Sequence, residues 1–471
     1  MWIVIVLIFH ILGFLSSINA VMTVRTSQGA IAWAVSLNAM PYIAVPAYWV
    51  LGRSKFDGYS TARQSSDDKI QENLKLLYDG LKDFSILSSE LKPASIAAQK
   101  LTDIPYLKGN DVKLLVDGDA TFGSIIEGID EAQDYILFQF FIVKDDEIGR
   151  KVKKHLIAKA KDGVKIYFLY DEVGSIDLPD SYKNELRKVG IEVHDFHTQK
   201  GKDNRFQLNF RNHRKLVVVD GKKAWIGGSN VGDEYLGKDP KFGHWRDTHV
   251  CIEGPAVISS QISFVEDWFW AIGEFIKTIT WKPTASKTSN KEVIIIPSGP
   301  ADELETATLM FLQAINSAKE RIWIASPYFV PDDSIIDAIQ LAGLRGVDVR
   351  ILIPDKKDHL AVWLAAFTYF DEASLTGARI YRYMDGFLHE KVMLIDYYHS
   401  SVGTANFDNR SMRLNFEITA MVSDREFNAQ VEKMFLADFE KAIEIKKGLL
   451  DSKPFYFRVG ANIARLTAPI Q

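Results

Sequence analysis

The stretch His213-Arg214-Lys215-Leu216-Val217-Val218-Val219-Asp220 decides the fold, because a second copy of its pattern occurs at His389-Glu390-Lys391-Val392-Met393-Leu394-Ile395-Asp396. A glycine-containing segment follows each copy, Gly227-Gly228-Ser229-Asn230 in the first and Gly403-Thr404-Ala405-Asn406 in the second. In both copies the asparagine lies 17 positions after the histidine. A lone His-x-Lys with a later Asp often arises by chance at a solvated strand edge. Two copies at matched spacing instead predict a duplicated domain.

The surrounding sequence repeats as well. The segment 141–146 (FIVKDD) is echoed by 328–333 (YFVPDD), and the turn at Gly163-Val164 is echoed at Gly346-Val347. Strand-like runs alternate with segments of helical length, which is typical of a layered α/β domain. The predicted strands include 112–116, 135–143, 165–170 and 292–296.

The same patterns predict the order of the parts. Residues 67–104 are charged and periodic without strand signals, which indicates a helical connector. Residues 282–291, rich in Lys, Ser and Thr, interrupt the α/β pattern and mark a boundary. The predicted parts are two transmembrane helices at 1–52, the connector at 53–110, a first α/β domain at 111–285 and a second at 286–471.

Two uncharged runs, 2–24 and 31–51, begin the chain. The first is long enough for a helix to cross a hydrocarbon core of roughly 30 Å, and we expect the two runs to form a transmembrane hairpin. Pro41 and Pro46 should bend the second helix, as membrane helices tolerate. A cleaved signal peptide is the alternative, but the first run lacks a basic start and the second would still anchor the chain.

Flanking cations predict the orientation in the membrane. Arg25 alone lies between the apolar runs, whereas Arg53, Lys55 and Arg63 follow the second run. Cytoplasmic loops carry an excess of Lys and Arg, so we expect the catalytic body on the cytoplasmic side.

Composition narrows the class of protein. Of the 471 residues, 47% are hydrophobic and 25% are charged, which allows packed cores and argues against disorder. The net charge is −5, whereas nucleic-acid binders usually carry excess Lys and Arg, so we expect no nucleic-acid partner. The single cysteine, Cys251, is too few for a disulfide or a thiolate metal site, and we expect neither a metal nor a cofactor.

The duplicated residues suit chemistry on a phosphodiester. If each motif lies on a strand, its histidine and lysine point to the same face and can grip one phosphate. A phosphodiester anion repels nucleophiles, so its charge must be neutralised, and the candidate donors are Lys215, Asn230, Lys391 and Asn406. A neutral imidazole can serve as nucleophile and a protonated one as acid, so His213 and His389 can divide these roles.

The chain resembles the phospholipase D superfamily, whose hallmark is His-x-Lys-x4-Asp in two similar domains. Within it the sequence is most similar to the bacterial cardiolipin synthases, through Pro327-Tyr328-Phe329-Val330-Pro331 and Asn415-Phe416-Glu417. The resemblance implies two tandem α/β/α sandwich domains related by pseudo-two-fold symmetry. It also implies an integral protein of the bacterial inner membrane that converts two phosphatidylglycerols into cardiolipin and glycerol through a phosphohistidine. By resemblance His213 attacks and His389 protonates the departing alcohol.

Four carboxylates complete the candidate site. An attacking imidazole needs its other nitrogen held, normally by a carboxylate. Asp247 and Glu417 resemble the acidic residues that orient the histidines in the family. The motif residues Asp220 and Asp396 are counted with the catalytic set, although their place beyond a four-residue strand also suits a structural role.

Three other functions fit parts of this pattern. A phospholipase D or another phosphatidyltransferase shares every motif residue and differs only in the alcohol that enters. A membrane-anchored nuclease is disfavoured by the acidic net charge and the apolar runs. A non-enzymatic scaffold is disfavoured because both copies keep His and Lys. Acyl-chain preference and oligomeric state are not encoded in any recognisable motif.

Overall fold

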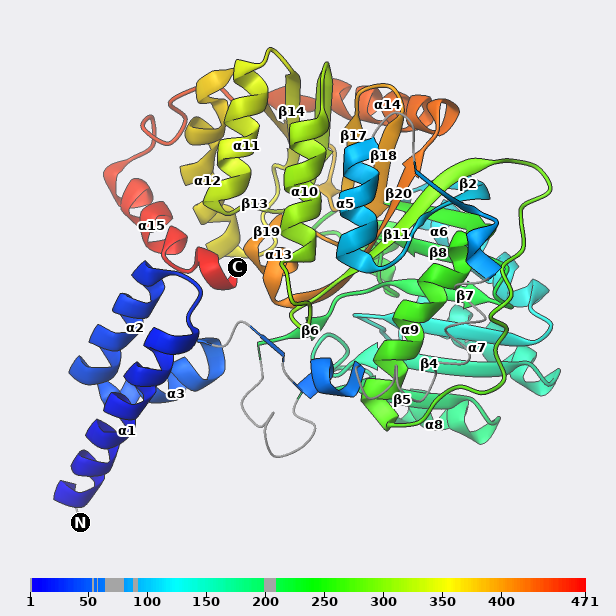
Figure 1. The fold of residues 1–471 in the computed structure, drawn as a ribbon, viewed down its shortest axis with the longest axis horizontal. Coiled ribbons are helices and arrows are strands. Elements are labelled where there is room, and N and C mark those ends of the chain that lie inside the picture. Colours follow the sequence, from blue (N-terminus) through cyan, green and yellow to red (C-terminus); the bar gives the residue numbers. More distant parts are fainter. Residues whose placement is uncertain (1, 53–54, 57, 64–79, 88–91, 199–208) are drawn as a thin grey trace.

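Two halves of like architecture follow a group of N-terminal helices (Figure 1). The computed structural model describes residues 2–52, 55–56, 58–63, 80–87, 92–198 and 209–471. In each half a central sheet carries helices on both faces, which confirms the predicted α/β/α architecture.

The sheet of the first half has the neighbour order β5, β4, β3, β7, β8, β10, β2. Strands β3, β4 and β5 are parallel, and the other pairings are antiparallel. Its elements are β2 (Tyr106–Val116), α6 (Asp117–Glu131), β3 (Tyr135–Phe140), α7 (Glu147–Lys161), β4 (Lys165–Asp171), α8 (Asp180–Lys188), β5 (Glu192–Phe196), β7 (Leu216–Val219), β8 (Lys223–Gly227), η2 (Asp233–Leu236), β10 (Thr248–Glu253) and α9 (Ala256–Ile272).

The second half repeats this order as β15, β14, β12, β17, β18, β20, β11. Its elements are β11 (Lys291–Ser298), α10 (Thr306–Ser317), β12 (Arg321–Ala325), α11 (Asp333–Leu344), β14 (Asp348–Pro354), α12 (Leu360–Ala373), η3 (Ser374–Thr376), β15 (Arg379–Tyr383), β17 (Val392–Ile395), β18 (His399–Gly403), α13 (Asn409–Arg413), β20 (Asn415–Ser423), α14 (Arg425–Glu440), β21 (Ala442–Glu444), α15 (Phe455–Arg465) and η4 (Ala468–Ile470). The repeat seen in the sequence is therefore a repeat of topology.

Strand β2 joins the two sheets. It pairs antiparallel with β10 of the first half and with β11 of the second, so the sheet is continuous across both halves. The predicted boundary between residues 110 and 111 is wrong, because it falls inside β2. The short elements that remain are β1 (Ser85–Ile86), α5 (Lys92–Thr102), β6 (Arg211–Asn212), β9 (Trp245–Arg246), β13 (Phe329–Val330), β16 (Phe387–Leu388) and β19 (Phe407–Asp408).

The predicted connector does not stand apart from the body. Within it, residues 64–79 and 88–91 lie outside the described residues, but β1 pairs with β2 and α5 packs against α10. Ala94 on α5 and Ile104 after it are buried, so this segment adds apolar surface to the second half.

The N-terminal helices differ from the predicted two-span hairpin. Helix α1 (Trp2–Thr23) has 22 residues and is, among the described residues, the one helix long and apolar enough to cross a membrane. The second apolar run is broken into α2 (Ser27–Ala39) and α3 (Pro41–Leu51). Pro41 cannot donate a backbone hydrogen bond and its ring would clash with the preceding turn, so α2 cannot continue through it.

Helix α3 turns back beside α1 instead of extending α2. Near the turn, a Cβ on Gly13 would touch the Leu37 carbonyl oxygen and Pro41. Towards the other end of α3, the Tyr48 hydroxyl donates to Asn19 Oδ1 over 2.6 Å. Helices α2 and α3 thus run antiparallel and parallel to α1, and the end of α3 returns to the level where α1 ends.

The last residue of each motif, Asp220 or Asp396, follows the motif strand and accepts hydrogen bonds from the backbone of a neighbouring segment. Asp220 accepts hydrogen bonds from the backbone N–H groups of Gln133, Asp134 and Tyr135 over 2.8–2.9 Å. Asp396 makes the matching contacts at the start of β12. Both residues have positive φ, 53° and 49°. These contacts indicate a structural role for both carboxylates, and their place in the catalytic set stays a prediction.

Asp220→Ala should therefore lower the melting temperature by several degrees, and Asp220→Asn should lower it less. Alanine leaves the buried Tyr135 N–H without an acceptor, at about 1–3 kcal/mol, and tolerates left-handed backbone poorly, at about 1–2 kcal/mol. Thermal unfolding in detergent measures this, with Asp337→Ala on the exposed face of α11 as control. If Asp220→Ala melted like the control yet lost activity, the catalytic interpretation would be the better one.

Candidate active site

The four motif side chains lie in irregular backbone rather than on strands. His213 and Lys215 fall between β6 and β7, and His389 and Lys391 fall between β16 and β17. The same-strand argument was therefore wrong, although each pair does lie together. Lys215 Nζ donates to the His213 carbonyl oxygen over 2.7 Å, and Lys391 Nζ donates to that of His389 over 2.6 Å. All four residues are buried.

Each imidazole is held by a carboxylate from the other half of the chain. His213 Nδ1 lies 2.9 Å from Oε2 of Glu417, which belongs to β20. His389 Nδ1 lies 2.8 Å from Oδ2 of Asp247, which lies between β9 and β10. The sequence identified both carboxylates but did not predict that each would contact the histidine of the other half. In His213 the engaged Nδ1 leaves Nε2 for chemistry, whereas Nε2 of His389 also lies 3.2 Å from Lys391 Nζ.

Backbone pairing across the halves explains the exchange. Strand β6 pairs in parallel with β20, and the His213 N–H donates to the Phe416 carbonyl over 2.9 Å. Strand β16 pairs in parallel with β9, and the His389 N–H donates to the Arg246 carbonyl over 2.8 Å. Each histidine thus bonds the residue before its orienting carboxylate. The two contacts obey the predicted pseudo-two-fold symmetry.

Burial sets the charge of the imidazoles. Desolvation lowers the pKa of His213 to about 4 and that of His389 to about 4, and the lysines of both motifs add to this effect. Burial opposes ionisation of Asp247, but His389 and Lys391 outweigh it and lower its pKa to about 2. At neutral pH the site therefore holds neutral imidazoles beside ionised carboxylates.

The lysines respond to the same environment. Burial lowers the pKa of Lys391 to about 8 and places the pKa of Lys215 well below its usual value, although Glu417 and Asp247 oppose this. Each lysine also acts on the pKa of the other motif's histidine. The two motifs consequently form one electrostatic unit, and an entering anion would favour the charged form of every cation in it.

The two asparagines differ in their surroundings. Asn230 accepts from the Ile142 N–H over 3.0 Å and donates to the Tyr235 hydroxyl over 2.7 Å, so it holds neighbouring protein groups. The Tyr235 ring lies 6.0 Å from that of His389. Asn406 is buried, and its Oδ1 has no hydrogen-bond partner. Phosphate binding by either amide stays a prediction.

Sequence reasoning missed the residue between His and Lys in each motif. Arg214 pairs with Asp267 of α9 over 2.8 Å, and Asp267 also accepts from Tyr59, Gln139 and Asn212 over 2.6–2.8 Å. All these side chains are buried and fix the loop that carries His213. The variable position of a duplicated motif is a signal that could have drawn attention to it.

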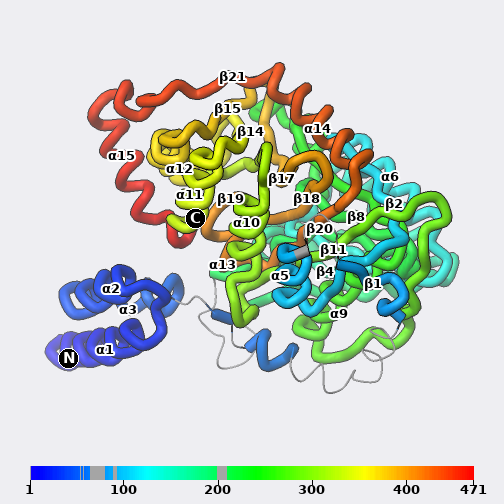
Figure 2. The backbone as a smooth tube through the Cα atoms, turned by 45° about the horizontal axis from the view of Figure 1, so that its top comes forward, coloured from blue at the N-terminus to red at the C-terminus, as the bar shows by residue number. Residues whose placement is uncertain are grey.

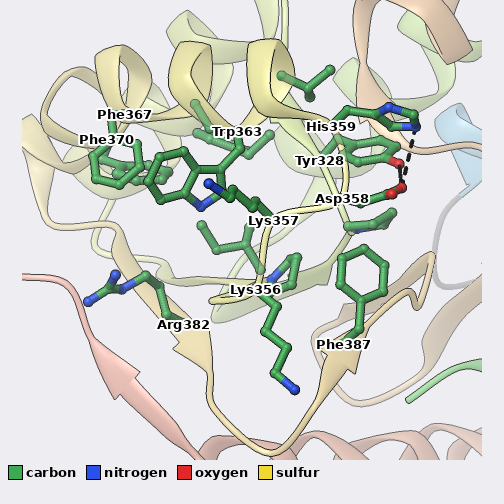
Figure 3. A pocket seen from close by; sticks show the side chains of 16 residues that line it. Tyr328, Lys356, Lys357, Asp358, His359, Trp363, Phe367, Phe370, Arg382 and Phe387 are labelled. Carbon is green, nitrogen blue, oxygen red and sulfur yellow. Dashed lines mark hydrogen bonds and ion pairs between the residues drawn. The ribbon is translucent and has the colours of Figure 1, made fainter. Parts of the chain in front are cut away.

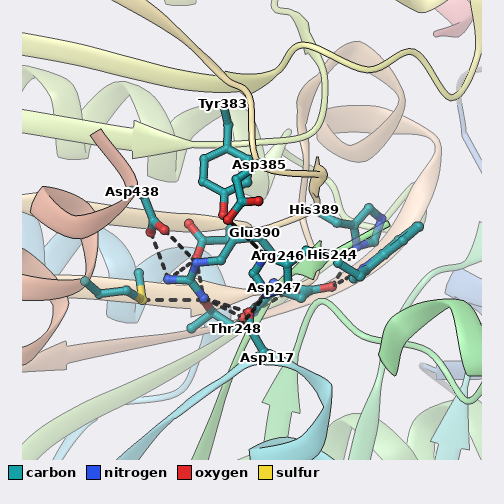
Figure 4. Close-up of polar contacts among 12 residues, drawn as sticks. Asp117, His244, Arg246, Asp247, Thr248, Tyr383, Asp385, His389, Glu390 and Asp438 are labelled. Atoms are coloured by element: carbon teal, nitrogen blue, oxygen red, sulfur yellow. Dashed lines mark hydrogen bonds and ion pairs between the residues drawn. The ribbon is translucent and has the colours of Figure 1, made fainter. Parts of the chain in front are cut away.

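In the second motif this position is an acid. Arg246, which precedes Asp247, binds Glu390 at 2.9 Å, Asp438 at 2.7 Å and Asp117 at 3.0 Å (Figure 4). Burial raises the pKa of Glu390 to about 8. Arg246 thus ties the segment that carries Asp247 to the loop that carries His389. Among the described residues, no group of three or more His, Cys, Asp or Glu side chains is arranged to hold a metal ion.

Comparisons with known proteins agree with this geometry. The family model described as "Cardiolipin synthase, PLD-like domain" matches residues 125–263 and 311–439, one segment in each half. Cardiolipin synthase A of Pseudomonas fluorescens Pf-5 is 47% identical over 466 residues, covering 98% of this chain and 97% of that protein. The chain belongs to the cardiolipin synthase family of phospholipase D-like proteins. Cardiolipin synthase A of Pseudomonas putida W619 is likewise 47% identical, covering 98% and 96% of the two chains.

Two solved structures are similar to this chain in fold. Phosphatidylserine synthase of Haemophilus influenzae is similar with a TM-score of 0.60 and 16% identity, covering 80% of this chain and 100% of that one. Polyphosphate kinase of Porphyromonas gingivalis is similar with a TM-score of 0.50 and 13% identity, covering 81% and 55%. At such low identity these likenesses concern the fold alone.

Glu417→Gln should reduce kcat by roughly 10- to 100-fold, because the amide no longer favours the charged or correctly oriented imidazole. The measurement is steady-state kinetics of wild type and variant at equal, verified folding. Glu426→Gln, on the exposed first turn of α14, is the matched control and should behave as wild type. Full activity in the Glu417 variant would rule out the orienting role.

Proposed function

We propose that this protein is an integral membrane phosphatidyltransferase that converts two phosphatidylglycerols into cardiolipin and glycerol. The observation that supports this proposal best is the exchanged pair of imidazole–carboxylate contacts, with one buried lysine beside each. The sequence relation to named cardiolipin synthases supports the choice of substrate.

In the first half-reaction, Nε2 of neutral His213 attacks the phosphorus of one phosphatidylglycerol. A P–N bond forms, the bond from phosphorus to the glycerol oxygen breaks, and His389 gives its proton to that oxygen, so that glycerol leaves. The low pKa of His389 in the empty site is compatible with this role, because a bound phosphodiester anion raises the pKa of a nearby imidazole. Lys215 and Lys391 stabilise charge on the phosphoryl oxygens.

In the second half-reaction, the glycerol hydroxyl of another phosphatidylglycerol gives its proton to His389 and attacks the phosphorus. The P–N bond breaks and cardiolipin leaves, so both histidines return to their starting state. One phosphodiester replaces another, so the exchange needs no external energy source. Assignment of attack to His213 rests on the family pattern.

Purified protein given labelled phosphatidylglycerol should form cardiolipin and glycerol in equal amounts, without added divalent metal or nucleotide-activated lipid. Excess glycerol should drive the reverse reaction, and His213→Ala should abolish both directions. Mass spectrometry identifies the products. Phosphatidic acid as the main product would indicate a hydrolase, and loss of activity on chelation would overturn the proposed mechanism.

We also propose that α1 crosses the membrane once and that α2 and α3 form a re-entrant pair. Thirteen residues of α2 reach about 20 Å, less than a ~30 Å hydrocarbon core. Both body-side ends touch the second half: Arg25 pairs with Glu305 at 2.6 Å, and Lys55 Nζ donates to the Glu303 carbonyl oxygen over 3.0 Å. Arg25 and Lys55 then both lie on the side of the body, which favours a cytoplasmic body and an external N-terminus.

The C-terminal helix supports this arrangement. On α15, Phe455 and Tyr456 are 79% and 77% exposed, while the Phe457 ring packs on Phe367 of α12 with 5.1 Å between centroids. Two views place α15 at the end of the body nearest α1–α3 (Figures 1 and 2). We propose that its exposed aromatic face lies in the membrane interface.

Cysteine labelling tests the single crossing. In a Cys251→Ala background, Trp2→Cys should react with a membrane-impermeant maleimide on intact spheroplasts, and Lys161→Cys on the body should react only after permeabilisation. Trp2 is 78% exposed and Lys161 lies near the end of α7, so both sites are accessible. Protection of both cysteines in intact spheroplasts would favour the two-span hairpin.

A further inference from the structure

The second half of the chain contains a surface cleft (Figure 3). It is open to the surface and is lined by α12, the segment before it, Tyr328 and Phe387. The motif histidines and lysines do not line the cleft, so it is separate from the phosphate site between them.

The cleft adjoins His389 rather than His213. Phe387 lines it, and the Phe387 ring centroid lies 6.1 Å from that of the His389 imidazole. Phe387 is held in place by the pairing of β16 with β9 and by the Trp245 ring, 4.9 Å away between centroids. In the proposed reaction His389 exchanges a proton with the alcohol. Phe387 therefore links the lining of the cleft to the surroundings of His389.

The lining combines an aromatic wall with cations. Trp363 and other side chains of α12 form the wall, and Lys356, Lys357 and Arg382 lie around it (Figure 3). Asp358 is the one carboxylate in the lining, and the Tyr328 hydroxyl donates to it over 2.8 Å. Arg382 is paired with Asp355, so Lys356 and Lys357 against the engaged Asp358 leave a positive excess suited to an anion.

The cations retain unused hydrogen-bonding capacity. Lys356 Nζ donates to a backbone carbonyl, that of Phe242, over 2.8 Å, and Lys357 Nζ lies 5.9 Å from the Trp363 ring centroid. Within the described part of the chain, neither ammonium has a carboxylate within ion-pair distance. Arg382 pairs with Asp355 through Nη1 at 2.9 Å, but its Nε is buried without a partner.

We propose that this cleft, the acceptor cleft, holds the phosphate and first acyl carbons of the phosphatidylglycerol that supplies the attacking alcohol. The inference rests on the proposed function. Water and glycerol carry neither a phosphate nor an acyl chain, so the cations and the aromatic wall favour a second lipid over these smaller acceptors. The cleft lies against α12, on which α15 packs, so a lipid can enter from the bilayer side.

The test compares two acceptors with one donor. The double variant Lys356→Gln/Lys357→Gln and the wild type are given phosphatidylglycerol in mixed micelles. Cardiolipin formation reports on the lipid acceptor. Incorporation of labelled glycerol into phosphatidylglycerol reports on the covalent intermediate without a second lipid. Lys151→Gln/Lys154→Gln, at exposed positions of α7, is the matched control.

Cardiolipin formation by the double variant should fall about 10- to 100-fold, the size expected for lost hydrogen bonds to charged groups. Glycerol incorporation should stay within about two-fold of wild type, and the share of phosphatidic acid should rise as water competes better. An equal fall in both reactions, or no change in either, would overturn the acceptor cleft. Failure of the wild type to form cardiolipin would instead overturn the proposed function, so the two failures are distinguishable.

Discussion

The exchange of carboxylates between the two halves is the contact on which the site depends. Glu417 of the second half holds His213, and Asp247 of the first half holds His389. Neither half alone contains both the histidine of its motif and the carboxylate that holds it. The proposed active site therefore exists only where the two halves meet. The strand pairs β6–β20 and β9–β16 supply the rigid backbone that such an exchange requires.

Charge balance explains how neutral and protonated imidazoles can alternate in a buried site. Burial is the main cause of the low pKa values of both histidines, and Lys215 and Lys391, which offset the charges of Glu417 and Asp247, add to it, so the empty site favours neutral histidines. A phosphodiester brings one negative charge, and a proton on one imidazole restores the balance. The substrate thus helps to create the acid that its own cleavage needs.

The proposed membrane helices and the acceptor cleft both involve the second half of the chain. The proposed single crossing with a re-entrant pair is consistent with the contacts of Arg25 and Lys55 with the second half. That half also carries α12, α15 and the cleft, whose aromatic wall is built from α12. In the proposed mechanism, donor chemistry is centred on His213, whereas the proposed lipid access lies near His389. The pseudo-two-fold symmetry of the fold is therefore broken in the surroundings of the site, as an exchange between two differently bound lipids requires.

The sequence by itself determined the duplicated α/β fold, the His and Lys residues of both motifs, and the two orienting carboxylates. Matched spacing and alternating patterns are features of the sequence itself, so they can be recognised without the structure. Tertiary structure alone decided which carboxylate serves which histidine, because Glu417 and His213 are separated by 204 positions and meet through strand pairing. It likewise decided that Pro41 turns α3 back beside α1, and that β2 is shared by both sheets. These features depend on contacts between distant segments, and composition and periodicity carry no record of such contacts.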